Sequence, residues 1–579
     1  MKVQFLNPVE QVTGSCTWLR QEAQNLEFLV DCGMMQGEPG ADDWNRRRFE
    51  FTPSRLHCVF LTHTHIDHCG LLPRLAKSGF NGLIYCTRES AELAKIALSD
   101  AARQPNALYS QKDVDRLKFH EPAGQLFGKL HPFATDLFFG CYRSAHIIGG
   151  VAIQIVWGPK PVAGQRSSQR SITFSGDLGC NVEGEEHLPL LRYRMSPPPA
   201  DYAVVESTYG GTVRLPEDQD FHARIDRLRG VVDRALFDRE GVLLIPCFAI
   251  DRTQSVLFDL HYLFRQDPER FAGVPVYLNS PMAAAVNSVY GDGMRRKEST
   301  GSKGLKPMWL NKRLFEWLNI EPTSDGERQL EDYLHAMFAP SASMQGAHPI
   351  YTALSRPVES LTEGPVRPAI VVTGGGMCDG GMILAYFEHL LRRASTTVLF
   401  TGYLSPATRG GQLFAHSRLS EADRLRSSDL LEWPNHAPDE PPHQIPLAEV
   451  KAGIETLTGY SGHADQRGLL DWLFHIFRDK PSLAGRTIFI THGAEDARRQ
   501  LESAILGRVA EWRHLHPDFT GDVTVHRPSK RRGWYDLDAG AWDAESSAAP
   551  DPASDRLTAI EQRLANIEEL LRRLTGPAS

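Results

Sequence analysis

The sequence predicts an α/β protein in which one α/β unit is inserted into another, sheet-rich domain. Short β-rich runs separated by turn residues fill the first 200 residues, whereas long helical patterns alternate with apolar strands after Glu206. Beyond Pro446 the sequence pattern of the first 200 residues returns, with apolar strands that end in polar loops. We therefore expect the middle of the chain to be an insertion within the first domain.

Length and composition limit the number of domains, the class of partner and the cellular compartment that the sequence allows. At 579 residues with 41% hydrophobic residues, the chain can fill two or three globular domains. The formal net charge of −8 excludes a global positive field, so a nucleic-acid site has to be local. Nine cysteines without a CxxC pair favour reduced thiols and a cytoplasmic protein. No run of residues has the pattern of a signal peptide or a membrane span, so we expect neither secretion nor membrane insertion.

Strands are expected where apolar and β-branched residues gather between turn residues. In the first domain these are Val3–Leu6, Glu27–Val30, Val59–Thr62, Gly82–Cys86, Val151–Trp157, Ser171–Ser175 and Asp201–Glu206. In the insertion we expect helices near Phe221–Arg239 and Arg252–Arg265, and parallel strands in VLLIP, PVYLNS, PAIVVTGGG and TVLFTGY. The proline-rich stretch between Ala407 and Pro446 marks the crossover. The expected parts are residues 1–207, the insertion 208–430, the C-terminal part 431–540 and a tail 541–579.

The tail combines a linker rich in Ala, Ser and Pro with a short heptad pattern. Apolar residues recur at steps of three and four, namely Leu557, Ile560, Leu564, Ile567, Leu571 and Leu574. Such a seam from Leu557 to Leu574 fits a coiled coil that makes the protein a homo-oligomer. It also fits a single amphipathic helix docked on the body, because three heptads are short.

The segment LTHTHIDHCG holds four potential metal ligands directly after an apolar strand: His63, His65, Asp67 and His68. A turn after a strand can aim the two alternate histidines at one ion and the following Asp and His at another, whereas structural zinc sites use widely spaced pairs. His146, Asp177 and His492 lie in loops of the same kind beside strands. Each alone is more often structural than a ligand, but together with the cluster they become candidates for the rest of two coordination shells.

Several motifs resemble those of one known family. LVDCGMMQG, THTHIDHCG, SAHIIGG and FSGDLG, in this order, resemble the motifs of the metallo-β-lactamase superfamily. VVESTYG, YSGHAD and THGAED resemble the further motifs of its β-CASP branch, whose members process nucleic acids, and LIPCFAIDRTQ, LNSPMA and TGGGMCDGG resemble its inserted domain. The resemblance covers roughly residues 1–535. It implies an αββα metallo-β-lactamase sandwich with an inserted α/β β-CASP domain, most similar to the cleavage and polyadenylation specificity endonuclease type.

The resemblance also implies a ligand set for two Zn²⁺ ions, with Mn²⁺ as an alternative. By it, His63, His65 and His146 hold the first ion. Asp67, His68 and His492 hold the second, and Asp177 bridges the two. Asp31 orients the cluster from outside it, and Cys69 is a packed thiol.

The chemistry expected of such a centre is a two-metal hydroxide mechanism of RNA hydrolysis, in which Asp67 belongs to the catalytic centre. The leaving oxygen needs a proton, and we assign Glu206 and His463 as the general-acid pair, with Glu206 orienting or charging His463. An alternative interpretation of Glu206 is that its carboxylate binds backbone amides in the loop after its own strand.

The expected substrate is RNA, most simply single-stranded, cut by endonuclease action, by 5′-to-3′ exonuclease action or by both. His492 favours RNA, because the DNA-repair members of the branch tend to have an apolar residue there. Arg252 and Ser280 lie where the family contacts phosphate, and the basic segment Arg295–Lys306 contacts RNA or is merely solvated. Two departures put substrate choice in doubt: Met382 stands where family members usually have arginine, and ATRGG replaces a GTLG-like turn.

Three rival functions remain open. A DNA nuclease of the same branch would use the same ligands, and a silent RNA-processing scaffold usually lacks some of them, whereas none is missing here. A small-molecule hydrolase such as a thioesterase or lactonase would not need the inserted domain or the ESTYG, SGHAD and THG motifs.

Overall fold

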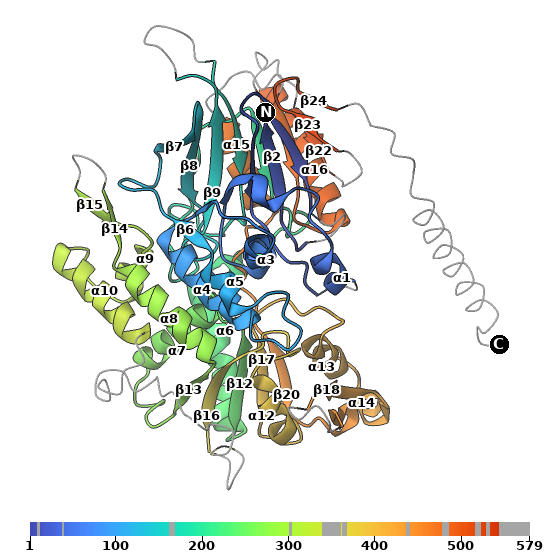
Figure 1. Ribbon diagram of the computed structural model, residues 1–579. Coiled ribbons are helices and arrows are strands. Elements are labelled where there is room, and N and C mark those ends of the chain that lie inside the picture. The colour runs from blue at the N-terminus through green and yellow to red at the C-terminus, as the bar shows by residue number, and fades with distance from the viewer. Residues whose placement is uncertain are drawn as a thin grey trace.

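The computed structural model describes residues 1–7, 12–37, 40–160, 168–299, 304–338, 361, 367–435, 441–477, 486–515, 523–528 and 533–543. Two large β-sheets form one body, and a parallel sheet flanked by helices forms a second body below it in Figure 1. The heptad pattern from Leu557 to Leu574 lies outside the described residues, so the expected oligomer stays a prediction. None of the helices that the structure describes is long and apolar enough to cross a membrane.

The first sheet has eight strands. In spatial order they are β24 (Ala541–Trp542), β23 (Tyr535–Asp536), β1 (Lys2–Phe5), β2 (Thr17–Gln21), β3 (Leu26–Val30), β4 (Leu56–Phe60), β5 (Leu83–Tyr85) and β6 (Lys118–His120). Pairing is parallel from β3 to β6, so the ends of these strands meet at one edge of the sheet.

The second sheet has seven strands. In spatial order they are β22 (Val523–His526), β21 (Arg486–Ile490), β11 (Tyr202–Val205), β10 (Arg170–Phe174), β9 (Val151–Trp157), β8 (Leu137–Arg143) and β7 (Leu130–Ala134). Neighbouring strands β10, β11 and β21 run parallel, and this brings their carboxyl ends together.

Alternating side chains pack the two sheets against each other and against helices. Phe28 and Phe60 point into the core between the sheets, where Phe60 lies 4.9 Å from Phe139 of the other sheet, ring centroid to ring centroid. Leu29 and Val59 are the sequence neighbours of Phe28 and Phe60, so their side chains point to the opposite face of the sheet, where they pack under helices. The helices on that side are α1 (Ala41–Arg46), α2 (Ile66–Cys69), α3 (Leu72–Lys77), α4 (Arg88–Ala101) and α5 (Gln111–Asp115). On the far side, α15 (Gln466–Phe477) and α16 (Glu495–Leu515) cover the second sheet, which completes the expected αββα sandwich.

The insertion is a five-stranded sheet with helices on both faces. Its parallel strands are β13 (Val276–Asn279), β16 (Ala369–Gly374), β12 (Val242–Cys247), β17 (Thr397–Phe400) and β20 (Gly453–Thr456). Its helices are α6 (Phe221–Asp233), α7 (Arg252–Gln266), α8 (Pro281–Met294), α9 (Arg313–Trp317), α10 (Ser324–Phe338), α12 (Ile383–Leu390), α13 (Arg409–Ser417) and α14 (Glu421–Arg426). Two hairpins complete it: β14 (Lys297–Ser299) with β15 (Leu305–Pro307), and β18 (Leu430–Trp433) with β19 (His443–Pro446).

The structure moves some of the expected boundaries. Gly453–Thr456 was expected in the C-terminal part of the first domain, but as β20 it pairs with β17 of the inserted sheet. Ala541–Trp542 was expected in the tail, but it pairs with β23 at the edge of the first sheet. The helix expected over Phe221–Arg239 ends at Asp233 and continues as a single π-helical turn.

Partly buried ion pairs join the insertion to the sandwich through the segment after α8. The Arg296 guanidinium contacts Glu89 at 2.8 Å and Glu121 at 2.7 Å, and the Glu89 side chain is only 2% exposed. Burial raises the pKa of Glu89, although Arg296 opposes that shift. Of the basic segment expected to contact RNA or solvent, Arg295, Arg296 and Lys297 are all in ion pairs.

Removing one of these cations tests how firmly the two bodies are joined. Arg296→Met leaves Glu89 buried without a cation, so we expect the free energy of unfolding to fall by about 3 kcal/mol. The control is Arg295→Met, because the Arg295–Asp332 pair is largely exposed and such pairs contribute about 1 kcal/mol or less. Urea denaturation measures both variants, and equal midpoints would contradict a structural role for Arg296.

Candidate metal centre

The predicted ligands lie in loops at one edge of the two facing sheets. Parallel strands place them there: Asp177 follows β10, Glu206 follows β11 and His492 follows β21. The HTHIDH loop follows β4 of the other sheet, and His146 lies in the loop between β8 and β9. The seven side chains predicted as ligands therefore come together in space.

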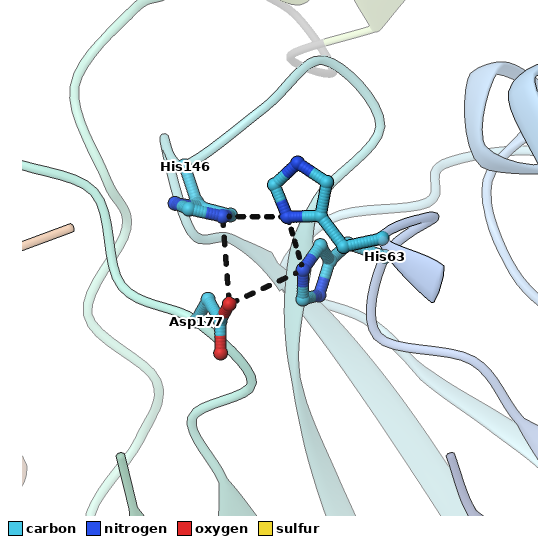
Figure 2. Close-up of side chains that lie close together, drawn as sticks. His63, His146 and Asp177 are labelled. Atoms are coloured by element: carbon cyan, nitrogen blue, oxygen red, sulfur yellow. Dashed lines mark hydrogen bonds and ion pairs between the residues drawn. The ribbon is translucent and has the colours of Figure 1, made fainter. Parts of the chain in front are cut away.

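One cluster consists of His63, His65, His146 and one oxygen of Asp177. His65 Nδ1 lies 3.1 Å from both His63 Nε2 and His146 Nε2. Asp177 Oδ2 lies 3.3 Å from His63 Nε2 and 3.5 Å from His146 Nε2. Figure 2 shows His63, His146 and Asp177 pointing toward one another.

A second cluster consists of Asp67, His68 and His492. His492 Nε2 lies 3.1 Å from His68 Nε2 and 3.2 Å from Asp67 Oδ2. The other oxygen of Asp177, Oδ1, lies 3.2 Å from His68 Nε2 and 3.6 Å from His492 Nε2. Asp177 thus offers one carboxylate oxygen to each cluster, which is the geometry of a bridging ligand.

The contacts between imidazole nitrogens fit a metal better than a hydrogen-bond network. Ligand nitrogens about 2.0–2.1 Å from a tetrahedral ion lie roughly 3.3 Å apart, close to the separations in both clusters. Burial lowers the pKa of His65 to about 3 and also lowers the pKa values of His63 and His146, so these rings are neutral and can donate lone pairs. Asp177 Oδ1 is buried without a hydrogen bond. This set of nitrogens and oxygens suits zinc, and manganese would accept the second cluster.

Residues behind the clusters fix which ring nitrogen faces inward. Asp31 accepts hydrogen bonds from the Thr62 amide and hydroxyl at 2.8 Å and contacts His68 Nδ1 at 2.8 Å, so His68 Nε2 is left to face the second cluster. Thr62 Oγ1 also contacts His63 Nδ1, and Thr208 Oγ1 contacts His492 Nδ1 at 3.0 Å. The orienting place of Asp31 was expected from the family resemblance, whereas the contacts of Thr62 and Thr208 were not, although both residues stand inside the motifs THTHIDHCG and VVESTYG.

His463 and Glu206 form a pair beside the first cluster. Both oxygens of Glu206 lie 3.1 Å from His463 Nδ1, and His463 Nε2 lies 3.9 Å from Asp177 Oδ2. Burial lowers the pKa of His463, but the carboxylates of Glu206 and then Asp177 outweigh it and raise the pKa to about 9. Glu206 also accepts hydrogen bonds from the amides of Leu178 and Thr208, so the backbone-binding and histidine-orienting interpretations of Glu206 describe the same carboxylate.

The expected substrate contacts lie at the carboxyl ends of the inserted strands. The Arg252 guanidinium donates to the Thr401 carbonyl, and the Ser280 hydroxyl caps α8 by accepting from the Ala283 amide at 3.2 Å. Met382 is 40% exposed just before α12, and ATRGG forms the start of α13. Cys69 is buried, and its thiol donates to the Thr64 carbonyl, as expected of a packed thiol.

Asp251, beside Arg252, has an unusual backbone and a shifted pKa. Its φ is 70°, in the left-handed region, and the Tyr290 hydroxyl donates to its Oδ1 at 3.0 Å. Burial raises the pKa of Asp251 to about 6, although Arg252 and Tyr290 oppose the shift. The folded protein therefore keeps a proton that the unfolded chain loses between about pH 4 and pH 6.

This shift predicts a pH-dependent effect of Asp251→Asn. The stability that the proton contributes is present below about pH 4 and is lost as the pH rises through 6. The asparagine variant avoids that loss, so its stability relative to the wild type should rise by up to about 3 kcal/mol between pH 4 and pH 8. Thermal denaturation at both pH values measures it, with exposed Asp332→Asn as the control. A difference that does not change with pH would contradict the assignment.

Three stretches of the chain match models of known protein families. Residues 9–143 match the model of the metallo-β-lactamase superfamily, residues 253–413 match the β-CASP domain, and residues 447–517 match the Zn-dependent metallo-hydrolase RNA specificity domain. Ribonuclease TTHA0252 of Thermus thermophilus is 29% identical over 82% of this chain and 90% of its own length. Transcription termination factor FttA of Methanothermobacter thermautotrophicus is 25% identical, and that of Methanocaldococcus jannaschii is 23% identical, each over 86% of this chain and 67% of its own length.

Proposed function

This chain belongs to the β-CASP branch of the metallo-β-lactamase superfamily, and from that premise we propose that it is a metal-dependent ribonuclease. It hydrolyses RNA phosphodiester bonds. The observation that supports this most strongly is Asp177, which faces one donor cluster with each carboxylate oxygen. A centre of this kind suits phosphodiester hydrolysis, in which the attacking and the leaving oxygen both have to be stabilised.

The proposed ligands of the first ion are His63, His65 and His146, and those of the second are Asp67, His68 and His492, with Asp177 shared. Two zinc ions, or manganese in their place, would supply positive charge to the phosphate oxygens and lower the pKa of a water molecule to near neutrality. Burial lowers the pKa values of His63, His65 and His146 and so keeps the rings of the first cluster neutral. Asp31, Thr62 and Thr208 orient ligand rings of both clusters through contacts with His68, His63 and His492.

His463 is the proposed general acid. Glu206 holds its Nδ1, so Nε2 faces the centre, and the His463 side chain is 20% exposed whereas that of Asp177 is 2% exposed. A raised pKa keeps the ring protonated at neutral pH, so it can give its Nε2 proton to the leaving oxygen. Glu206 then stabilises the ring while it is charged.

Two observations favour RNA as the substrate. The RNA specificity domain model covers residues 447–517, which include His463 and His492, and a relative that spans most of this chain is named a ribonuclease. A DNA nuclease with the same ligands is the alternative, and a catalytically silent RNA-processing scaffold is a third hypothesis.

The proposal includes both endonuclease and 5′-to-3′ exonuclease action. It also includes a cytoplasmic location, which the nine free cysteines support.

The test is cleavage of end-labelled single-stranded RNA and of DNA with the same base sequence, with zinc or manganese and with a chelator. We expect RNA cleavage that the chelator stops, that Asp67→Ala abolishes and that the exposed control Asp332→Ala leaves intact. The ladder of products distinguishes cutting inside the strand from trimming at its end. Cleavage of DNA alone would establish the alternative, and no cleavage of either strand by metal-loaded protein would contradict the proposal.

A further inference from the structure

The carboxyl ends of the inserted parallel strands face the metal centre. Strand β20 ends at Thr456, and the chain then reaches His463 within seven residues. The neighbouring strands β17 and β12 end just before Tyr403 and Phe248. Ligands of parallel α/β sheets bind outside such carboxyl ends, so this edge is where a substrate that reaches the centre passes the insertion.

Two aromatic rings lie on this edge without being covered. Phe248 is 46% exposed and Tyr403 is 65% exposed, and among the described residues they are the aromatic side chains left most open to solvent. Nearby rings of the same domain, such as those of Tyr386 and Phe400, are fully buried. The two rings follow strands β12 and β17, which pair in parallel, and exposed apolar side chains that gather on one surface mark a binding site.

Glycines let the strand ends approach these side chains closely. A Cβ at Gly376 would lie 3.1 Å from the Phe248 ring, and a Cβ at Gly402 would lie 3.0 Å from an Arg252 guanidinium nitrogen. Arg252 in turn lies 5.8 Å from the ring centroid of Tyr460, on the loop that leads to His463. Arg252 therefore connects the aromatic edge to the loop that carries the general acid.

The occupant that fits is an unpaired nucleobase. The chain has a net charge of −8, and Arg295, Arg296 and Lys297 of the basic segment after α8 are paired with carboxylates. Attraction between these cations and the RNA phosphates is therefore weak, and other contacts have to contribute to RNA binding. Bases stack on exposed aromatic rings whatever their sequence, and a cation beside the rings suits the phosphate that follows each base.

We propose that Phe248 and Tyr403 form a stacking platform for unpaired bases of the substrate strand, with Arg252 beside it toward the centre. The inference rests on the proposed ribonuclease function and specifies its substrate as single-stranded RNA read without base preference. Bases inside a duplex cannot present a free face to the rings. Paired RNA should therefore bind more weakly than unpaired RNA of the same sequence.

The test combines protein variants with abasic substrates. Phe248→Ala and Tyr403→Ala should each raise the KM for single-stranded RNA by about 5- to 150-fold with little change in kcat, because the rings bind substrate without touching the reacting atoms. Tyr403→Phe keeps the ring and should keep the KM. Leu425→Ala removes a side chain that is 67% exposed outside this edge and serves as the control.

An abasic position moved along the RNA identifies the base that stacks. At one position, the missing base should raise the KM of the wild-type protein as much as Tyr403→Ala does. The same abasic RNA should not raise the KM of the Tyr403→Ala variant any further. Variants with unchanged KM, or losses that add at every abasic position, would overturn the platform while cleavage by the wild type upholds the ribonuclease. Wild-type protein that cuts no RNA would overturn both.

Discussion

Asp177→Ala is expected to abolish RNA cleavage and to lower the metal content of the purified protein. The change removes both carboxylate oxygens that lie between the clusters, one 3.3 Å from His63 Nε2 and the other 3.2 Å from His68 Nε2. Because a metal centre contributes several kcal/mol of transition-state stabilisation, the loss of activity should be about 10³-fold or more.

Elemental analysis together with the cleavage assay measures this effect. Asp201→Asn is the matched control, since Asp201 precedes β11 of the same sheet and accepts from the Ser171 amide, away from the clusters. Full metal content in active Asp177→Ala protein would contradict the bridging role.

His463→Ala should slow RNA cleavage by about 10²- to 10⁴-fold and leave the metal content unchanged. His463 lies outside both ligand clusters, and its Nδ1 contacts Glu206 while its Nε2 faces Asp177 Oδ2 at 3.9 Å. We propose that His463 protonates the leaving oxygen. The loss of activity in His463→Ala should therefore be larger for a leaving oxygen that needs a proton than for one that does not.

A phosphodiester with a nitrophenolate leaving group separates this role from a structural one. Such a leaving group departs without a proton, so His463→Ala should cleave it at nearly the wild-type rate, whereas Asp177→Ala should not. Equal losses on RNA and on the nitrophenyl ester would show that His463 does not act as the acid.

The residues of the site that could be predicted from the sequence are those that directly follow a predicted strand. His63 and His65 stand just after an apolar run, and parallel pairing of β10, β11 and β21 brings Asp177, Glu206 and His492 to the same edge. The assignment of each ligand to one of two clusters came from family resemblance. In the structure the same side chains lie close together in two clusters.

The rest depends on contacts between residues far apart in the chain. Thr208 contacts His492 across 284 positions, and no local pattern marks such a pair. Strand β8 was missed because Gly140 interrupts its apolar run, although the whole strand is buried. The basic segment after α8 was ambiguous for the same reason, because its partners Glu89 and Glu121 lie in the other body.

Metal reconstitution shows whether these two clusters form one metal centre that hydrolyses RNA. Protein stripped of metal should be inactive, and activity should rise with added zinc or manganese until about two ions are bound per chain. RNA cleavage at full rate by protein whose measured metal content is near zero would contradict the account.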